Sequence, residues 1–415
     1  MQYQRPEKPD PIAPRIIIHG GAGNITRQNL TPESYHVYRR ALISIIGRAN
    51  AQLQEPHASA LDVATFAVSL LEENPLFNAG RGAVYTTAGT HELEASVMVS
   101  TGSRKRGVGV MKVRQAKSPI KLAREMLVRG EEDDGGGARG HNQLEGEMCD
   151  RLNHAWGLES VKPSYFWTRR RWDEHRVGLE RADGVASLAE TESSQVDGQN
   201  VDDPSWNGND YLPQGTVGAV VLDSSGVLCV ATSTGGLTNK LPGRIGDTPT
   251  LGAGFWAEQW QDRRPQPDNQ SPNWLQACFP GLHSYTALEP APECTIRAVA
   301  MSGTGNGDSF LRTNAARTAA AIARYAADTS HNQPITLQNA VTAVAGPHGQ
   351  LQQSAGDRWK HTGEGEGGII GIELVEGRGH IVYDHNCGGM FRAYVDDNGH
   401  THFGVFQDEK EILWK

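Results

Sequence analysis

Short runs of β-branched and other apolar residues, most of them followed by glycine, recur along this chain and constrain its fold more than any other feature. The first run is RIIIHGGAG at 15–23, and TVGAVVLD and GVLCVATSTGG follow from residue 216. Three more, GGIIGIELV, GHIVYDHN and THFGVF, lie close together beyond residue 366. Such runs are typical of buried strands that end in tight turns. Glycine supplies 48 of the 415 residues, above the usual ~7%, so the sequence predicts many turns and close backbone approaches.

Four segments have the apolar spacing of helices. Three begin at Thr31, Ser59 and Ser118, with proline directly after the first and the third, and a fourth begins at Leu311. Threonine and serine are favoured as helix caps, and proline at the first helical position. Because strands in hairpin-like succession lie on both sides of paired helices, the sequence predicts a layered α+β fold with largely antiparallel sheets. We expect one domain over 15–415.

Two segments do not fit this pattern of strands and helices. Residues 168–213 mix charged residues with serine, glycine and asparagine and contain few aliphatic side chains. The backbone hydrogen bonds of a buried loop of this length would be hard to satisfy, so a mobile, exposed linker is expected there. Residues 258–293 contain proline, glutamine and tryptophan, and we expect a surface insertion.

Composition excludes some classes of partner. The net charge of −9 argues against nucleic acid or an anionic membrane surface, because both reward basic patches. No run of 18 apolar residues and no signal-peptide pattern is visible. The five cysteines are scattered without a CxxC pair, which is typical of reduced thiols, so a cytoplasmic protein is expected.

The junction between Gly215 and Thr216 is the sharpest candidate for chemistry. Thr216 follows a polar segment and opens a strand-like run. Threonine becomes a useful nucleophile when a base lies beside it, and its own α-amino group can be that base once the preceding bond is cut. The alternative is that Thr216 only opens a strand, where β-branched residues are favoured. The junction alone leaves both interpretations open.

Other residues could bind a small polar ligand. Asn78 in a glycine loop could donate to an oxyanion or cap a turn. Arg244 and Asp247, in PGRIGDTP, could hold a carboxylate and an ammonium group or form a local ion pair. Thr234 and Thr304 precede glycines at strand ends, where they could face a ligand or only form turns.

Two cofactor classes are disfavoured by the sequence. The SGTGNGD segment lacks the spacing of a dinucleotide loop. No cysteine or histidine cluster suggests zinc. We expect His19 to be a structural hydrogen-bonding residue rather than a general base.

Together the motifs resemble the plant-type asparaginase/isoaspartyl peptidase family of N-terminal-nucleophile hydrolases. The resemblance covers most of 15–130, 214–257 and 295–406. It rests on eight motifs in family order: IIIHGGAG, LEENPLFNAGRGAV, HELEASVM, SPIKLA, GTVGAVVLD, ATSTGG, NKLPGRIGDTPTLGAG and GTGNGD.

The resemblance implies a four-layer αββα sandwich made as a precursor that cuts itself between Gly215 and Thr216. The fragments 1–215 and 216–415 would remain together as α and β subunits, and two such heterodimers commonly pair. The implied activity is hydrolysis of the side-chain amide of L-asparagine and of β-aspartyl (isoaspartyl) dipeptides, which releases L-aspartate.

The resemblance also implies roles for individual residues. Thr216 would be the nucleophile, supported by Thr234, and Thr304 and Gly305 would line the oxyanion hole with Asn78 close by. Arg244 and Asp247 would hold the α-carboxylate and α-amino groups, helped by the backbone of Gly307. No cofactor is implied except a structural sodium ion, held by main-chain carbonyls of a loop within 71–81: Leu71, Glu72, Asn74, Phe77, Ala79 and Arg81.

One departure from the family pattern leaves alternatives open. TGNGD carries Asn306 where plant-type members more usually have a second threonine, and it is closer to the glycosylasparaginases of the same fold. Against that branch, Gly215 precedes Thr216 where glycosylasparaginases have aspartate. A third interpretation, a non-cleaving homologue with a binding role, is motivated by the two unusual segments.

Overall fold

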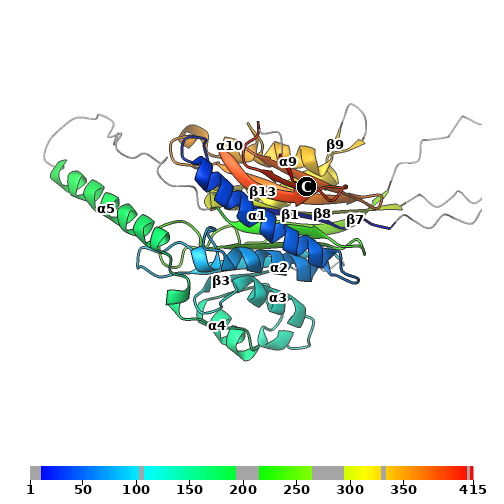
Figure 1. Ribbon diagram of the computed structural model, residues 1–415, viewed down its shortest axis with the longest axis horizontal. Helices are drawn as coiled ribbons and strands as arrows, with labels where there is room; N and C mark the ends of the chain where they lie inside the picture. Colours follow the sequence, from blue (N-terminus) through cyan, green and yellow to red (C-terminus); the bar gives the residue numbers. More distant parts are fainter. Residues whose placement is uncertain are drawn as a thin grey trace, which may run out of the picture.

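The computed structural model describes residues 11–101, 107–192, 215–263, 294–328, 333–408 and 412–414. Mixed helix and sheet are present throughout, as the sequence predicts (Figure 1). None of the helices in these ranges is long and apolar enough to span a membrane.

The larger sheet has nine strands in the order β15-β14-β13-β1-β5-β6-β2-β3-β4. All neighbours are antiparallel except β3 and β4. Its strands are β1 (Arg15–Gly23), β2 (Leu93–Val99), β3 (Gly107–Val113), β4 (Gln143–Glu145), β5 (Val217–Leu222), β6 (Leu228–Thr234), β13 (Gly389–Val395), β14 (Thr401–Gly404) and β15 (Ile412–Trp414).

A second, four-stranded antiparallel sheet has the order β12-β11-β8-β7. Its strands are β7 (Phe255–Arg263), β8 (Cys294–Gly305), β11 (Gly367–Val375) and β12 (Arg378–His385), and a small hairpin is formed by β9 (Ala327–Asp328) and β10 (Gln333–Pro334). The helices are α1 (Pro32–Leu53), α2 (Ala60–Glu73), α3 (Pro119–Arg129), α4 (Gly146–Ala155), α5 (Arg169–Glu192), α7 (Gly307–Thr313), α8 (Ala315–Tyr325), α9 (Leu337–Ala345) and α10 (Gln350–Ser354).

Three apolar cores hold these elements together. One lies between the nine-stranded sheet and helices α1, α2 and α3, and another between the four-stranded sheet and helices α8 and α9. The third lies between the two sheets. In β5, Ala219 packs into the first core and its neighbour Val220 into the third. Because both faces of the strand are buried, its sequence is a continuous apolar run rather than an alternating one.

The helix starts predicted at Thr31, Ser59 and Ser118 are confirmed. Thr31 and Ser59 are the N-caps of α1 and α2, and each side chain accepts a hydrogen bond from a backbone N–H of the first turn. Ser118 also stands at the N-cap of α3. Its hydroxyl instead donates to the buried carboxylate of Glu72 at the end of α2. This hydrogen bond therefore joins the start of α3 to the end of α2.

The single helix predicted from Leu311 is wrong: α7 begins at Gly307 and α8 at Ala315, because Asn314 between them is left-handed with φ at +48°.

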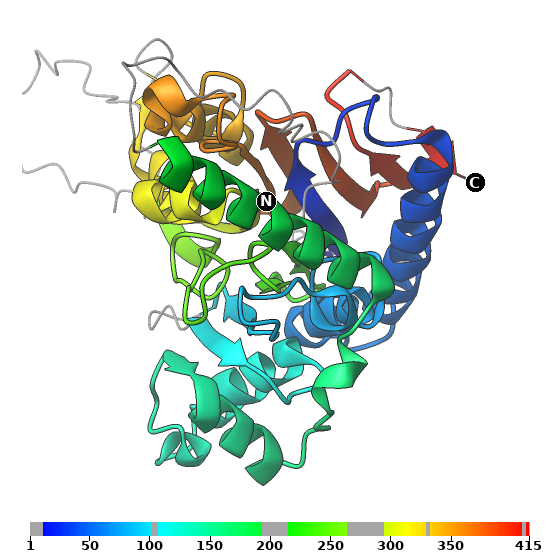
Figure 2. The same cartoon turned by 90° about the vertical axis from the view of Figure 1, so that its left-hand side faces the viewer.

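The interpretation of 168–213 as a mobile linker is wrong for its first half, which forms helix α5 (Figure 2). Arg171, Glu174 and His175 are buried at 3%, 7% and 4% exposure. Arg171 pairs with Glu174 and donates to the Gly82 carbonyl. The helix is therefore anchored by polar contacts, which aliphatic content does not reveal. Residues 193–213 lie outside the described ranges.

The predicted start of the surface insertion, at residue 258, is also wrong, because it falls within a strand. Strand β7 continues to Arg263, and Glu258 and Trp260 within it are buried. Glu258 pairs with Arg317 and Arg324 of α8. Residues 264–293 lie outside the described ranges.

Candidate active site

Gly215 and Thr216 lie directly before β5, where the two sheets meet. A Cβ atom added to Gly215 would lie 2.5 Å from both the Ala22 nitrogen and the Thr304 hydroxyl oxygen. Gly21, with φ at +117°, packs against the same residue from the end of β1. Only glycine fits this gap without displacing backbone atoms.

Thr216 is held by two other threonines. Its hydroxyl is 2.8 Å from the Thr248 hydroxyl, and its carbonyl accepts a hydrogen bond from the Thr304 hydroxyl at 3.0 Å. The Thr304 oxygen in turn accepts from the Ala22 N–H at 3.1 Å. Thr304 belongs to β8 of the four-stranded sheet, so its side chain joins the two sheets at the Gly215–Thr216 junction.

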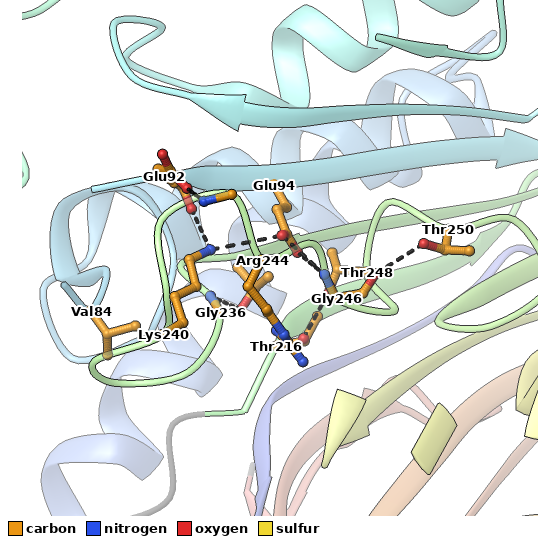
Figure 3. A network of polar contacts seen from close by, with 12 residues as sticks. Val84, Glu92, Glu94, Thr216, Gly236, Lys240, Arg244, Gly246, Thr248 and Thr250 are labelled. Carbon is orange, nitrogen blue, oxygen red and sulfur yellow. Dashed lines mark hydrogen bonds and ion pairs between the residues drawn. The ribbon is translucent and has the colours of Figure 1, made fainter. Parts of the chain in front are cut away.

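A small pocket opens beside Thr216. Figure 3 labels four residues of its wall that have polar side chains: Glu94, Thr216, Arg244 and Thr248. A wider surface hollow beside α4 contains none of the predicted residues. The pocket contains six of them, and four others complete its wall: the lining residues are Glu94, Thr216, Thr234, Gly236, Leu237, Arg244, Asp247, Thr248, Gly305 and Gly307.

Arg244 and Asp247 supply the opposite charges of this pocket. Arg244 Nη2 lies 3.0 Å from Asp308 of α7, whereas Arg244 Nε has no partner among the described residues. Asp247 is 4% exposed, and its Oδ2 is likewise unpaired within the described part of the chain. Burial raises the pKa of Asp247 to about 7, although Arg244 lowers it. A Cβ on Gly307 would lie 2.5 Å from Asp247 Oδ1, so glycine there leaves this carboxyl accessible.

Thr234 and Asn78 act on the turn after β6. The Thr234 hydroxyl accepts a hydrogen bond from the Gly236 N–H at 3.0 Å. Asn78 Nδ2 donates to the Gly236 carbonyl at 2.7 Å, and its Oδ1 accepts from the Val84 N–H at 3.1 Å. Asn78 does not line the pocket. Its amide holds the turn in place, which agrees with the interpretation of Asn78 as a turn cap rather than with that of an oxyanion donor.

Four pocket residues were not singled out from sequence, and two of them, Thr248 and Glu94, have polar side chains. Thr248 follows Asp247 in the quoted GRIGDTP motif, and its carbonyl accepts from the Ser96 hydroxyl at 2.6 Å. Glu94, in HELEASVM, is 0% exposed, and burial raises its pKa. Both residues lie in motifs on which the family resemblance rests. Glu94 could have been recognised as a site candidate from the sequence, because it is a charged residue within an apolar strand.

His19 is structural, as expected from sequence. It is fully buried in β1, and its Nε2 lies 2.7 Å from the Ser302 hydroxyl of β8. Burial lowers the pKa of His19 to about 3, so the ring is neutral at physiological pH and links the two sheets.

The predicted sodium loop forms the end of α2 and the turn after it. The carbonyls of Leu71, Asn74 and Ala79 accept backbone hydrogen bonds within this turn. The carbonyl oxygens of Glu72 and Phe77 point at the positions that side chains on Gly80 and Gly82 would occupy. Main-chain oxygens therefore crowd this turn. Among the described residues, no group of three or more histidine, cysteine, aspartate or glutamate side chains could hold a metal ion.

The sequence model of the family described as Asparaginase matches residues 12–261. The chain belongs to this asparaginase family. It is 33% identical to the isoaspartyl peptidase of Salmonella typhimurium over 395 residues, which cover 95% of this chain and 98% of the relative. The isoaspartyl peptidase of Escherichia coli is 32% identical over 96% and 98% of the two chains. A putative isoaspartyl peptidase/L-asparaginase of Dictyostelium discoideum is 30% identical over 92% of each.

Proposed function

We propose that this chain is a self-processing threonine hydrolase that cleaves the side-chain amide of L-asparagine and of β-aspartyl dipeptides. The observation that carries the proposal is one small pocket that contains the Thr216 hydroxyl and the Arg244–Asp247 pair. A zwitterionic amino acid needs opposite charges at one end of its site and a nucleophile at the other. Relatives named isoaspartyl peptidase and L-asparaginase support this assignment.

Self-cleavage would begin with attack of the Thr216 hydroxyl oxygen on the Gly215 carbonyl carbon. The new C–O bond replaces the C–N bond, and the Thr216 nitrogen leaves as an amine. Water then hydrolyses the ester, so that Gly215 gains a carboxylate and Thr216 recovers its hydroxyl. The close packing of Gly215 against Ala22 and Thr304 supports this step, because it restrains the residue whose carbonyl is attacked.

Hydrolysis would use the amine that cleavage frees. An α-amino group titrates near ~7.7–8.0, so at neutral pH it can accept the Thr216 hydroxyl proton. Arg244 would bind the substrate α-carboxylate, and Asp247 its ammonium group. Thr304 and Gly305 would line the oxyanion hole. Ammonia or an amino acid leaves first, and water then releases L-aspartate from the ester on Thr216.

The proposal extends to the architecture and assembly. The cores on both sides of the paired sheets support a four-layer αββα sandwich of the N-terminal-nucleophile type. We infer that 1–215 and 216–415 form an αβ heterodimer, and that two heterodimers pair. A structural sodium ion would fit the carbonyl-rich turn after α2, held by the main chain of Leu71, Glu72, Asn74, Phe77, Ala79 and Arg81.

Glycosylasparaginase activity is the second candidate, motivated by Asn306 in TGNGD. The Asn306 side chain caps α7, because its Oδ1 accepts from the Ser309 N–H at 3.1 Å and from the Ser309 hydroxyl at 2.8 Å. This cap explains asparagine at 306 without a glycosylated substrate, so the first proposal is preferred.

The test uses the purified full chain incubated at neutral pH. Intact mass should show fragments 1–215 and 216–415, and the processed protein should release ammonia and aspartate from L-asparagine. Thr216→Ala should remain full-length and inactive. An unprocessed wild-type chain would support the non-cleaving homologue, and activity confined to a glycosylated asparagine would support the second candidate.

A further inference from the structure

Two buried carboxylates and one buried ammonium, those of Glu92, Glu94 and Lys240, lie together at the substrate pocket, whose wall includes Glu94 (Figure 3). Glu92 and Glu94 stand at the start of β2, and Lys240 comes from the loop after β6. They are 1%, 0% and 5% exposed. Burying charges is costly unless they are paired and hydrogen-bonded, so the group needs a structural or functional explanation.

The two carboxylates hold the backbone on either side of Arg244. Glu92 accepts a hydrogen bond from the Gly243 N–H at 2.7 Å, and Glu94 accepts from the Gly246 N–H at 3.1 Å. Lys240 joins them, because its Nζ donates to the Glu92 carbonyl at 2.8 Å and lies 3.7 Å from Glu94 Oε1. The segment that carries Arg244 is thus fixed at both ends.

Electrostatics support these contacts. The pKa of Glu92 is below its usual range: burial raises it, but the Gly243 N–H and Arg114 lower it by more. Arg114 lies 2.5 Å from Glu92 on the side away from Gly243. Burial raises the pKa of Glu94, against the opposing effects of Lys240 and Arg244.

The position of the Arg244 guanidinium depends on this backbone. The guanidinium lies over Gly246, where an added Cβ would approach Arg244 Nη1 to 2.8 Å and Glu94 Oε2 to 3.2 Å. The Arg244 side chain forms an ion pair with Asp308, which is half exposed. A loose segment would therefore let the cation move relative to Thr216.

We propose that Glu92 and Glu94 are positioning residues that set Arg244 for the α-carboxylate of the substrate. They act through the Gly243 and Gly246 N–H groups rather than by touching the reacting atoms. This inference rests on the proposed function, because it assumes that Arg244 binds a carboxylate.

The test compares alanine and glutamine at each position in the processed protein. Both replacements remove the charge, but glutamine keeps an oxygen that can accept the backbone N–H. Calorimetry measures the binding of L-aspartate and of β-alanine, which lacks the α-carboxylate. Glu94→Ala should bind L-aspartate about tenfold more weakly than Glu94→Gln, and Glu92→Ala more weakly than Glu92→Gln by a similar factor. β-Alanine affinity should stay within about twofold; tenfold corresponds to about 1.4 kcal/mol.

Thermal unfolding checks that each variant is folded. The matched control is Glu147→Ala, whose side chain is exposed on α4, and this variant should bind both ligands like wild type. If one alanine variant does not fold, the pair at the other position decides. Equal L-aspartate affinity in the alanine and glutamine variants would overturn the inference. Equal weakening of both ligands would also overturn it, because a general structural defect predicts that result. Wild-type protein that binds no L-aspartate would refute the proposed function as well.

Discussion

Replacing Gly215 by alanine should slow self-cleavage strongly. The added Cβ would lie 2.5 Å from the Ala22 nitrogen and the Thr304 hydroxyl and 2.7 Å from Gly21 Cα. Ordinary contact begins at 3.4 Å, so the residue must move by about 0.9 Å, the difference between 3.4 and 2.5 Å. Two of the three obstructing atoms belong to the backbone of β1, which cannot yield cheaply. A misplacement of about 1 Å between reacting groups costs on the order of 10²-fold in rate.

The assay follows the appearance of the two fragments by intact mass after purification, with circular dichroism to verify folding. Gly47→Ala is the matched control, because a Cβ there meets nothing within 4 Å inside helix α1. The control should be processed at the wild-type rate, and Gly215→Ala about a hundred times more slowly. Once processed, Gly215→Ala should hydrolyse L-asparagine with wild-type kcat. Wild-type processing of a folded Gly215→Ala chain would refute the reasoning.

Two further predictions concern stability. Burial raises the pKa of Glu72 to about 7 from 4.5, ahead of the opposing hydrogen bonds from Ser118 and Ser233. Its contribution to stability is therefore full below pH 4.5 and is lost as the pH rises through 7, by about 3 kcal/mol. Urea unfolding measures the free energy of unfolding of wild type and of Glu72→Gln between pH 4.5 and 8. Because glutamine does not titrate, the variant should lack this loss, and the difference between the two proteins should change with pH. A difference that is independent of pH would contradict the prediction. Separately, His175 Nδ1 lies 2.5 Å from Asn239 Oδ1; a double-mutant cycle of His175→Ala and Asn239→Ala should give a coupling of about 1 kcal/mol, and additive effects would show that this contact does not anchor α5.

Local patterns predicted much of the fold. Thr31 and Ser59 identify helix starts because a cap is made within one turn of the chain. β-Branched runs such as 15–23 identify buried strands for a similar local reason. Helix α5 was missed because its burial depends on distant segments: Arg171 donates to the Gly82 carbonyl, and His175 contacts Asn239. Composition counts these residues as solvent-exposed, whereas tertiary pairing buries them.

The sequence by itself determined the mixed architecture, the family motifs and the identity of the glycine–threonine junction. Only the tertiary structure decided which side chains serve that junction. Thr248 reaches Thr216 across 32 residues, and Glu94 reaches Gly246 across 152. It also showed that Asn78 holds a turn rather than facing the pocket. Hydrogen bonds over such separations depend on sheet register and loop placement, and no local pattern in the chain encodes those distances.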